Sequence, residues 1–356
     1  MGEKCFRAGD VRVNENPGLT SLQTIWMRQH NKVARTLQQL NPLWDDERLF
    51  QEARRIVAAQ VQIVVYGEFL PSVLGLELMA HYHLLPLAYG FTNYDPWTDA
   101  TMSNDFAAGA YRFGHSQVNT RFKFENTSVK EEFFALEDFY FFPFDLYKRG
   151  LDPILLGLIH QSSDEVDRHV TSAETEHLYR ARTEPFGLDL VAIDIQRGRD
   201  HGLPAYVDYV EYCGGPNIMT FDDMRALIPD NVVDIYEQLY ENARDVDLFT
   251  AGLTEFHVAG AVVGPTFACI LGQMFHSLKF GDRFYYEHGN EAGSFTRAQL
   301  QELRKTTFAQ IICDNSNVIR RIQANVFQQV STHNPTRYCG QLPRTRLTPW
   351  REGQHG

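Results

Sequence analysis

Apolar residues recur at spacings of three and four in two long stretches near the start of this sequence. That spacing is typical of one buried face of a helix. The first stretch follows a Pro-Gly pair, and its apolar positions are Leu19, Leu22, Ile25, Trp26, Val33 and Leu37. The second runs from about Asp45 to Val65, with Leu49, Ala53, Ile56, Val57, Val61 and Val64 expected to point inward. The pattern therefore predicts two long amphipathic helices.

A third helix is expected after Thr296, because this threonine and Gln299 three residues later have the spacing of a capping box. Leu300, Leu303 and Ile311 would then line one side of that helix. Alternating strand patterns are scarce, and the chain contains no repeat, low-complexity tract or charged linker. We therefore predict a mainly α-helical fold in which residues 1–356 form one continuous domain.

The composition supports a folded protein with a large core. Hydrophobic residues make up 44% of the 356 residues and aromatic residues 13%, which argues against disorder and against a small disulfide-dense fold. Lys and Arg number 33 against 45 Asp and Glu, so the formal charge is 33 − 45 = −12. Nucleic acid is an unexpected partner for such an acidic chain, because surfaces that bind phosphates are usually basic.

Neither a membrane helix nor a signal peptide is expected from the apolar runs. The best candidate, residues 258–271, is interrupted by Gly260, Gly264 and Pro265 and is shorter than the roughly 18 residues that a membrane helix needs. The first ten residues lack the apolar core of a signal peptide. We therefore predict no transmembrane segment in this chain.

Five cysteines are spread along the chain without a CxxC pair, so a structural zinc site is not expected. An odd number leaves one thiol unpaired in a secreted protein, whereas in a cytosolic protein all five would be buried thiols. Composition does not choose between these alternatives. The single glycosylation sequon at positions 126–128 slightly favours secretion.

Four short segments carry residues suited to catalysis, although each alone has an ordinary structural explanation. They are positions 9–15 (GDVRVNE), 111–115 (YRFGH), 194–202 (DIQRGRDHG) and 281–284 (GDRF). Most histidines are surface or core residues, and a Gly-Asp-x-Arg string is usually a loop with an internal ion pair. The run from Arg197 to Gly202 would ordinarily be a solvated turn with its own salt bridges.

Taken together with other strings in the same order, these segments give the chain a family resemblance. The further strings are AGDVR at 8–12, RQHN at 28–31, NPLWD at 41–45, QEAR at 51–54, LP at 70–71, RFGH at 112–115, GLDL at 187–190, QRGRDHG at 196–202 and IICDN at 311–315. From about Cys5 to about Arg351 the chain resembles the animal haem peroxidases. The resemblance implies haem as cofactor, hydrogen peroxide as oxidant and an electron donor as second substrate.

In that family a proximal histidine binds the haem iron, and the matching residue is His115. His201 is the less suitable candidate, because we expect ion pairing in its charged turn to occupy it. The family orients the proximal ring with an asparagine, whereas this chain has Asp194. A carboxylate accepts the ring N–H more strongly than an amide does and shifts the ring toward imidazolate. The alternative is that Asp194 turns away into a structural ion pair.

Four further residues match haem-contacting positions of the family. Arg12 matches the distal arginine, a permanent cation that stabilises charge on the leaving peroxide oxygen. Glu15 matches a carboxylate that the family esterifies to a haem methyl, and otherwise is an ordinary glutamate before a helix. Arg112 and Arg197 match residues that face the haem propionates, and otherwise are structural arginines.

The family analogy also pairs the cysteines as Cys213–Cys269 and Cys313–Cys339, which leaves Cys5 single. Upstream of Gly-Asp-x-Arg the family has its distal histidine, in a Gln-Phe-x-x-His-Asp context, and its calcium loop; this sequence has neither string. We therefore expect a partial haem peroxidase domain, secreted like its family, with slow turnover. The alternatives are a non-catalytic haem-binding or adhesion protein of the matrix, and a scaffold without haem. The donor (halide, phenol or protein tyrosine) and the oligomeric state stay open.

Overall fold

The fold of this computed structural model is mainly helical, as the sequence predicted, and is described for residues 5–353 except 127–128, 144 and 182. The α-helices of the described residues are α1 (Pro17–Leu40), α2 (Asp46–Val64), α3 (Leu70–His81), α4 (Asn104–Ala108), α5 (Asp145–Arg149), α6 (Asp152–His160), α7 (Ser172–Thr175), α8 (Leu190–Asp200), α9 (Tyr206–Tyr212), α10 (Phe221–Met224), α11 (Asp230–Leu239), α12 (Leu248–Gly252), α13 (Pro265–Phe280), α14 (Arg297–Leu303) and α15 (Phe308–Asn315). Short 3₁₀ or π turns are η1 (Val11–Asn14), η2 (Val65–Phe69), η3 (Ala110–His115), η4 (Leu136–Asp138), η5 (Ala243–Asp245), η6 (Cys339–Gln341) and η7 (Thr348–Trp350).

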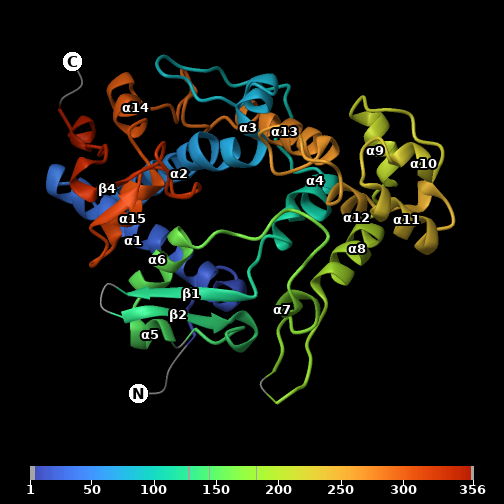
Figure 1. Ribbon diagram of the computed structural model, residues 1–356. Coiled ribbons are helices and arrows are strands. Elements are labelled where there is room, and N and C mark those ends of the chain that lie inside the picture. The colour runs from blue at the N-terminus through green and yellow to red at the C-terminus, as the bar shows by residue number, and fades with distance from the viewer. Residues whose placement is uncertain (1–4, 127–128, 144, 182, 354–356) are drawn as a thin grey trace.

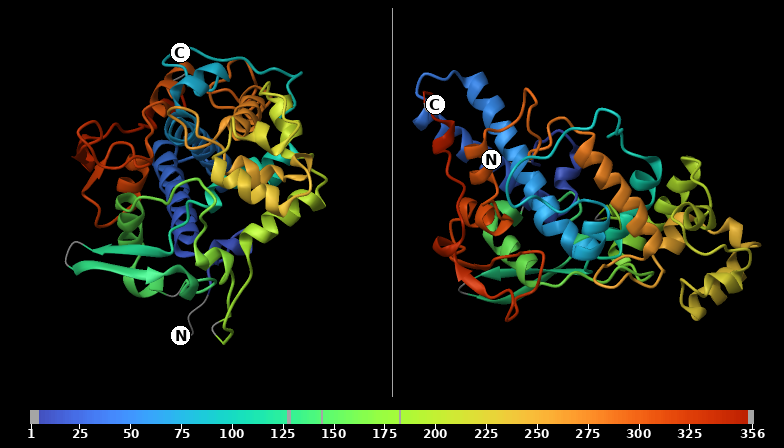
Figure 2. Two further views of the ribbon diagram at one scale, coloured as in Figure 1. Left: turned by 45° about the vertical axis from the view of Figure 1, so that its right-hand side comes forward. Right: turned by 90° about the horizontal axis from the view of Figure 1, so that it is seen from above.

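Two small antiparallel hairpins complete the described fold. β1 (Arg121–Asn126) pairs with β2 (Val129–Ala135), and β3 (Arg321–Gln323) pairs with β4 (Thr336–Tyr338). In Figure 1 the β1–β2 hairpin lies at the lower left, α1, α2 and α3 lie above it, and the group of α9, α10 and α11 lies at the right; Figure 2 gives two further views. The largest cluster of buried apolar residues joins α1, α2 and α3 to α13 and α14. The helices α9, α10 and α11 share a separate apolar cluster.

The first predicted helix is present as α1, which begins at Pro17 and so includes the Pro-Gly pair that was expected to precede it. The side chain of Asn16 accepts a hydrogen bond from the backbone N–H of Leu19 at 3.0 Å, and Pro17 occupies the first turn. Ile25 and Leu37 are fully buried, whereas Leu22, which the pattern placed inward, is exposed. The first turns of α1 instead bury small residues, Gly18, Thr20 and Ser21, which the apolar spacing did not mark.

α2 was also predicted correctly in its extent, but one of its inward positions was wrong. Asp45 caps the helix by accepting from the N–H of Arg48 at 2.8 Å. The buried stripe contains the polar Gln60, whereas Val61 is 37% exposed. Because one residue turns the helix by about 100°, burying Gln60 points the next side chain away from the core.

α2 continues through the π-helical turn η2 into α3, which bends at Gly75. This glycine has φ +74°, and the backbone oxygen of Gly260 lies 2.6 Å from where a Cβ would stand. By length and composition the helical run Asp46–His81 is the one span among the described residues that passes as membrane-crossing. Half of its most apolar window is buried inside the protein, as in a core helix. The sequence contains no uninterrupted apolar run of this length, because polar residues such as Gln60 and Gln62 lie within the span.

The third predicted helix is two helices. Thr296 and Gln299 form the expected capping box, since each side chain accepts from the other residue's backbone N–H. α14 nevertheless ends at Leu303, and Thr307 caps the new helix α15 by accepting from the N–H of Gln310. Ile311 therefore belongs to α15, and the expectation of one continuous helix was wrong.

Candidate active site

The candidate site forms where the 3₁₀ turn η3 approaches helix α8. Ala110 and Phe113 of η3 are buried in the core. A 3₁₀ turn has three residues per turn, so Arg112 and His115 lie above one another on a second edge. Gly109 allows η3 to follow α4 closely, because a Cβ at this position would stand 2.8 Å from the backbone oxygen of Asp105 in α4. The sequence therefore directs Arg112 and His115 to the same side of η3.

α8 supplies the carboxylate that both of these side chains contact. Nδ1 of His115 lies 2.5 Å from Oδ2 of Asp194, and Nη1 of Arg112 lies 2.6 Å from Oδ1. Asp194 is fully buried, whereas the side chain of His115 is 32% exposed. Asp194 therefore does not turn away from His115: one carboxylate oxygen contacts the imidazole, and the other forms an ion pair with Arg112.

The second ring nitrogen of His115 is available for a ligand. No described residue forms a hydrogen bond with its Nε2, while Nδ1 is held by Asp194. With Nδ1 protonated, the neutral ring directs the lone pair of Nε2 away from the carboxylate. One accessible imidazole nitrogen with a fixed second nitrogen is the arrangement that a haem iron requires of its protein ligand.

Arg12 lies on the turn η1 and is paired with Asp10. Its Nε and Nη2 donate to the two carboxylate oxygens at 2.8 and 2.9 Å, and the arginine side chain is 66% exposed. These hydrogen bonds lower the pKa of Asp10 to about 2. The Gly-Asp-x-Arg segment thus contains the internal ion pair that such loops usually have, and the distal role of Arg12 stays a prediction.

Glu15 lies within electrostatic range of His115, so the structure brings the start of the chain to the candidate site. Burial raises the pKa of Glu15, while Arg12, a hydrogen bond from Tyr179 and His115 act in the opposite direction. Tyr179 has an unusual backbone φ of +58° for a non-glycine residue. Its phenol has a pKa raised to about 12, mainly by burial and then by the charges of Glu15 and Glu174.

Sequence reasoning missed Glu174, a third carboxyl group near this site. It is 3% exposed, and no described residue hydrogen-bonds to its Oε2. Burial raises its pKa, and the charges of Glu15, His115 and Asp194 also act on it. Glu174 lies on the four-residue helix α7, and nothing in the surrounding sequence marks it as a site residue.

The remaining predicted residues lie on or beside the second half of α8. Arg197 is exposed, and its side chain forms no hydrogen bond or ion pair with a described residue. Arg199 pairs with Asp247 at 2.7 Å. Nδ1 of His201 lies 2.7 Å from Oδ1 of Asn104, so an amide, and not the expected ion pair, occupies His201. The propionate roles of Arg112 and Arg197 stay predictions.

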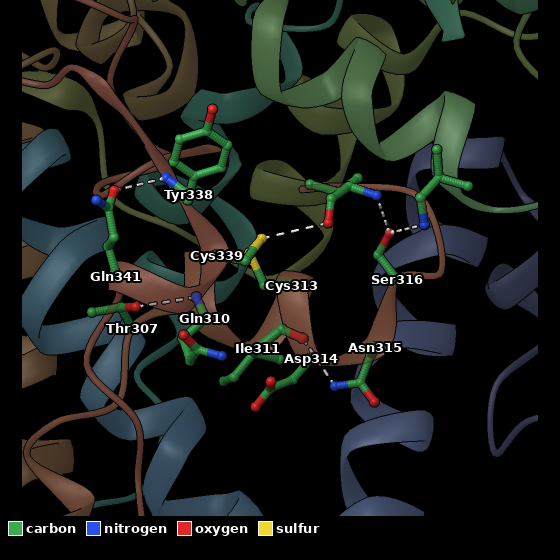
Figure 3. Close-up of a disulfide and its surroundings, with 12 residues drawn as sticks. Thr307, Gln310, Ile311, Cys313, Asp314, Asn315, Ser316, Tyr338, Cys339 and Gln341 are labelled. Carbon is green, nitrogen blue, oxygen red and sulfur yellow. Dashed lines mark hydrogen bonds between the residues drawn. A yellow bond between two sulfur atoms is a disulfide. The ribbon is translucent and has the colours of Figure 1, made fainter. Parts of the chain in front are cut away.

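The expected cysteine pairing is confirmed. Cys213 is bonded to Cys269 and Cys313 to Cys339, and Cys5 is free and exposed. The second bond ties the C-terminal half of α15 to the segment after β4 (Figure 3). Of the sequon at 126–128, Thr127 and Ser128 lie outside the described residues.

A helical scaffold that presents a histidine held by a buried carboxylate is compatible with a haem protein, and comparison with known proteins defines the class. The animal haem peroxidase family model matches residues 1–327. The chain therefore belongs to the animal haem peroxidase family.

Individual relatives agree with this assignment. The chain is 40% identical to a peroxidase of Drosophila melanogaster over 98% of its own length and 51% of the relative. It is 38% identical to the chorion peroxidase of Drosophila melanogaster, over 98% of this chain and 44% of that protein. The solved structure of peroxidase A from Dictyostelium discoideum superposes with a TM-score of 0.78 and 33% identity, covering 90% of this chain and 59% of that one. The chain thus spans about half the length of these curated relatives.

Proposed function

We propose that this chain is a haem peroxidase domain that oxidises a donor with hydrogen peroxide. The contact between His115 and Asp194 carries the proposal. A fully buried carboxylate fixes one ring nitrogen at 2.5 Å and leaves the other without a described partner. Membership of the animal haem peroxidase family supports the same cofactor.

The residues present fit a haem group. Nε2 of His115 would bind the iron, and Asp194 would keep the ring oriented through the hydrogen bond at Nδ1. Arg112 holds Asp194 in place through its second oxygen. Arg197, exposed and without a described partner, would neutralise a propionate. When bound, haem supplies the redox chemistry that cleaves peroxide and withdraws electrons from the donor.

The proposed acid–base chemistry of this chain is incomplete, and we propose that its turnover is slow for that reason. Arg12 would provide a permanent positive charge near the peroxide, but a guanidinium does not accept a proton at neutral pH. A positioned general base typically contributes about 10²–10⁴-fold to such a reaction. Burial raises the pKa values of two carboxyl groups near the site, Glu15 and Glu174, towards neutral pH.

The two disulfides support an oxidising compartment for the mature chain. Such bonds form and persist in secreted proteins and are rare in the cytosol. We therefore propose that the domain acts outside the cell, on a small donor or on a tyrosine of another protein.

Steady-state oxidation of guaiacol by the haem-loaded chain tests this proposal. We expect turnover above that of an equal concentration of free haemin, reduced to the haemin level in His115→Ala. Arg12→Ala is expected to lower turnover further than the matched variant Arg35→Ala, which changes an exposed arginine of α1. Wild-type turnover equal to free haemin would refute the proposal of a peroxidase.

A further inference from the structure

The C-terminal part of the sequence has a charge opposite to that of the whole chain. Residues 315–351 contain six arginines and neither Asp nor Glu, in a chain whose formal charge is −12. The six are Arg320, Arg321, Arg337, Arg344, Arg346 and Arg351, and all of them are exposed. A local excess of one charge attracts ligands of the opposite charge, even on a protein whose net charge has the other sign.

The Cys313–Cys339 disulfide holds this run of arginines against α1 and α15. Cys339 precedes Arg344 by five residues, and Cys313 directly precedes Asp314. Nη2 of Arg344 lies 3.8 Å from Oδ1 of Asp314, and Nζ of Lys32 on α1 lies 2.9 Å from Oδ2. Asp314 leaves α15 on the side opposite to Cys313 (Figure 3). Cations from α1 and from the C-terminal segment therefore meet at this carboxylate.

Two further arginines lie beside the same carboxylate. Arg28 and Asp314 line a hollow of about 350 Å³, and Nη1 of Arg28 donates to the backbone oxygen of Asn315 at 3.1 Å. Arg346 and Asp314 line a neighbouring hollow of about 290 Å³. The backbone N–H of Arg346 donates to Oε2 of Glu302 at 2.9 Å, which fixes the position of the residue while its side chain stays exposed.

The nearby carboxylates do not cancel this positive charge. The cations of the surface, named here the Asp314 patch, are Arg28, Lys32, Lys305, Arg344 and Arg346. Its carboxylates are Asp314 and Glu302, and the latter is paired with the lysine of α14's end at 2.6 Å. Five cations against two carboxylates leave an excess of three positive charges. Arg35 is not counted, because it also lines a hollow with Asp46 and Glu47.

The walls between these charges carry hydroxyl and amide groups. They include Asn31, Ser316 and Asn317 in the larger hollow and Thr36, Thr306 and Thr345 in the smaller one. Such side chains both donate and accept hydrogen bonds, as the hydroxyl groups of a sugar require. Single-stranded nucleic acid is instead bound by aromatic side chains on which its bases stack, and none of the described residues lining the two hollows is aromatic.

We propose that the Asp314 patch binds a sulfated polysaccharide outside the cell. Sulfate stays anionic at physiological pH, and the planar fork of a guanidinium donates two parallel hydrogen bonds to such an oxyanion. The two hollows adjoin at Asp314, so a linear polysaccharide that crosses them meets cations of α1 and of the C-terminal segment in succession. The proposal needs the extracellular location proposed above, but it does not depend on peroxidase activity.

Calorimetric titration of the full chain with a short heparin oligosaccharide tests this proposal. Arg344→Gln/Arg346→Gln should bind it about tenfold more weakly than the wild type, because two exposed charge pairs with sulfate are lost. The slope of log affinity against log salt should become shallower by about 1–2, since each contact to a polyanion releases roughly one counterion. The matched control Arg244→Gln/Arg283→Gln removes two exposed arginines outside the patch and should bind like the wild type.

Asp314→Asn supplies the second arm of the experiment. Removing the central carboxylate frees Lys32 and should strengthen heparin binding by about threefold, a gain that misfolding does not produce. Unchanged or weaker binding by this variant would contradict the assignment. No heparin binding by the wild type, or equal losses in the two double variants, would overturn the proposal. Single-stranded DNA of matched charge that binds as tightly as heparin would overturn the preference for a sulfated sugar.

Discussion

Removing the carboxylate of Asp194 should destabilise the chain even without a cofactor. Asp194 is fully buried and contacts two cationic or polar partners, His115 at 2.5 Å and Arg112 at 2.6 Å. In Asp194→Ala both side chains lose their partner. Loss of one member of a buried pair typically costs about 3–5 kcal/mol.

The structure places this variant near the lower end of that range. The side chain of Arg112 is 25% exposed, and its Nε keeps a hydrogen bond to the backbone oxygen of Ala107 at 3.1 Å. Water therefore partly replaces the lost carboxylate, and we expect the free energy of unfolding to fall by about 3 kcal/mol. Asp194→Asn keeps an acceptor for one partner only, so about half of that loss is expected, roughly 1.5 kcal/mol.

Urea unfolding of the cofactor-free chain, followed by circular dichroism, measures these changes. Asp200→Ala is the matched control, because Asp200 is exposed at the end of the same helix. The predicted order of stability is wild type and Asp200→Ala, then Asp194→Asn, then Asp194→Ala. If Asp194→Ala were as stable as the control, the two short contacts would contribute nothing and the reasoning from burial would be refuted.

Two further predictions concern stability. Burial raises the pKa of Glu68 from 4.5 to about 7, so the stability that its protonated form provides is lost as the pH rises through this window. Urea titrations should show the stability of Glu68→Gln relative to wild type increasing by about 3 kcal/mol between about pH 4 and pH 8, and a constant difference would contradict the assigned pKa. The disulfides Cys213–Cys269 and Cys313–Cys339 span 56 and 26 residues, so loss of either by serine substitution should cost about 3–4 kcal/mol in the chain-entropy model. Non-reducing peptide mapping checks the pairing, and a bond from Cys5 to any of the other four would contradict it.

Local patterns sufficed for the parts of the fold that depend on neighbouring residues. The start of α2 followed from Asp45, and the capping box followed from Thr296 and Gln299, because each involves contacts within three or four residues. The end of α14 was missed because Thr307 caps a new helix and thereby competes with continuation of the old one. Apolar spacing also predicted that Val61 is buried. Packing against the rest of the protein instead buries the polar Gln60 and leaves Val61 exposed.

The candidate site likewise contains residues that local motifs predict and residues that only the fold brings together. His115 and Asp194 followed from short motifs that resemble a known family, and the structure brings them into contact. Glu174 was missed because it approaches the charges of Glu15 and Asp194 through the fold and not through any local pattern. The sequence also does not predict that the buried side-chain amide of Gln310 lacks a hydrogen-bond partner among the described residues, because this depends on how the chain packs.

Titration with haemin, followed by the Soret absorbance, tests the central claim that His115 holds the haem iron. The wild type and His201→Gly should each bind one haemin with the same shifted Soret band, because His201 is occupied by Asn104. His115→Gly should lose that band and recover it when free imidazole fills the space left by the missing ring. An unchanged spectrum in His115→Gly, or no haemin uptake by the wild type, would contradict the account.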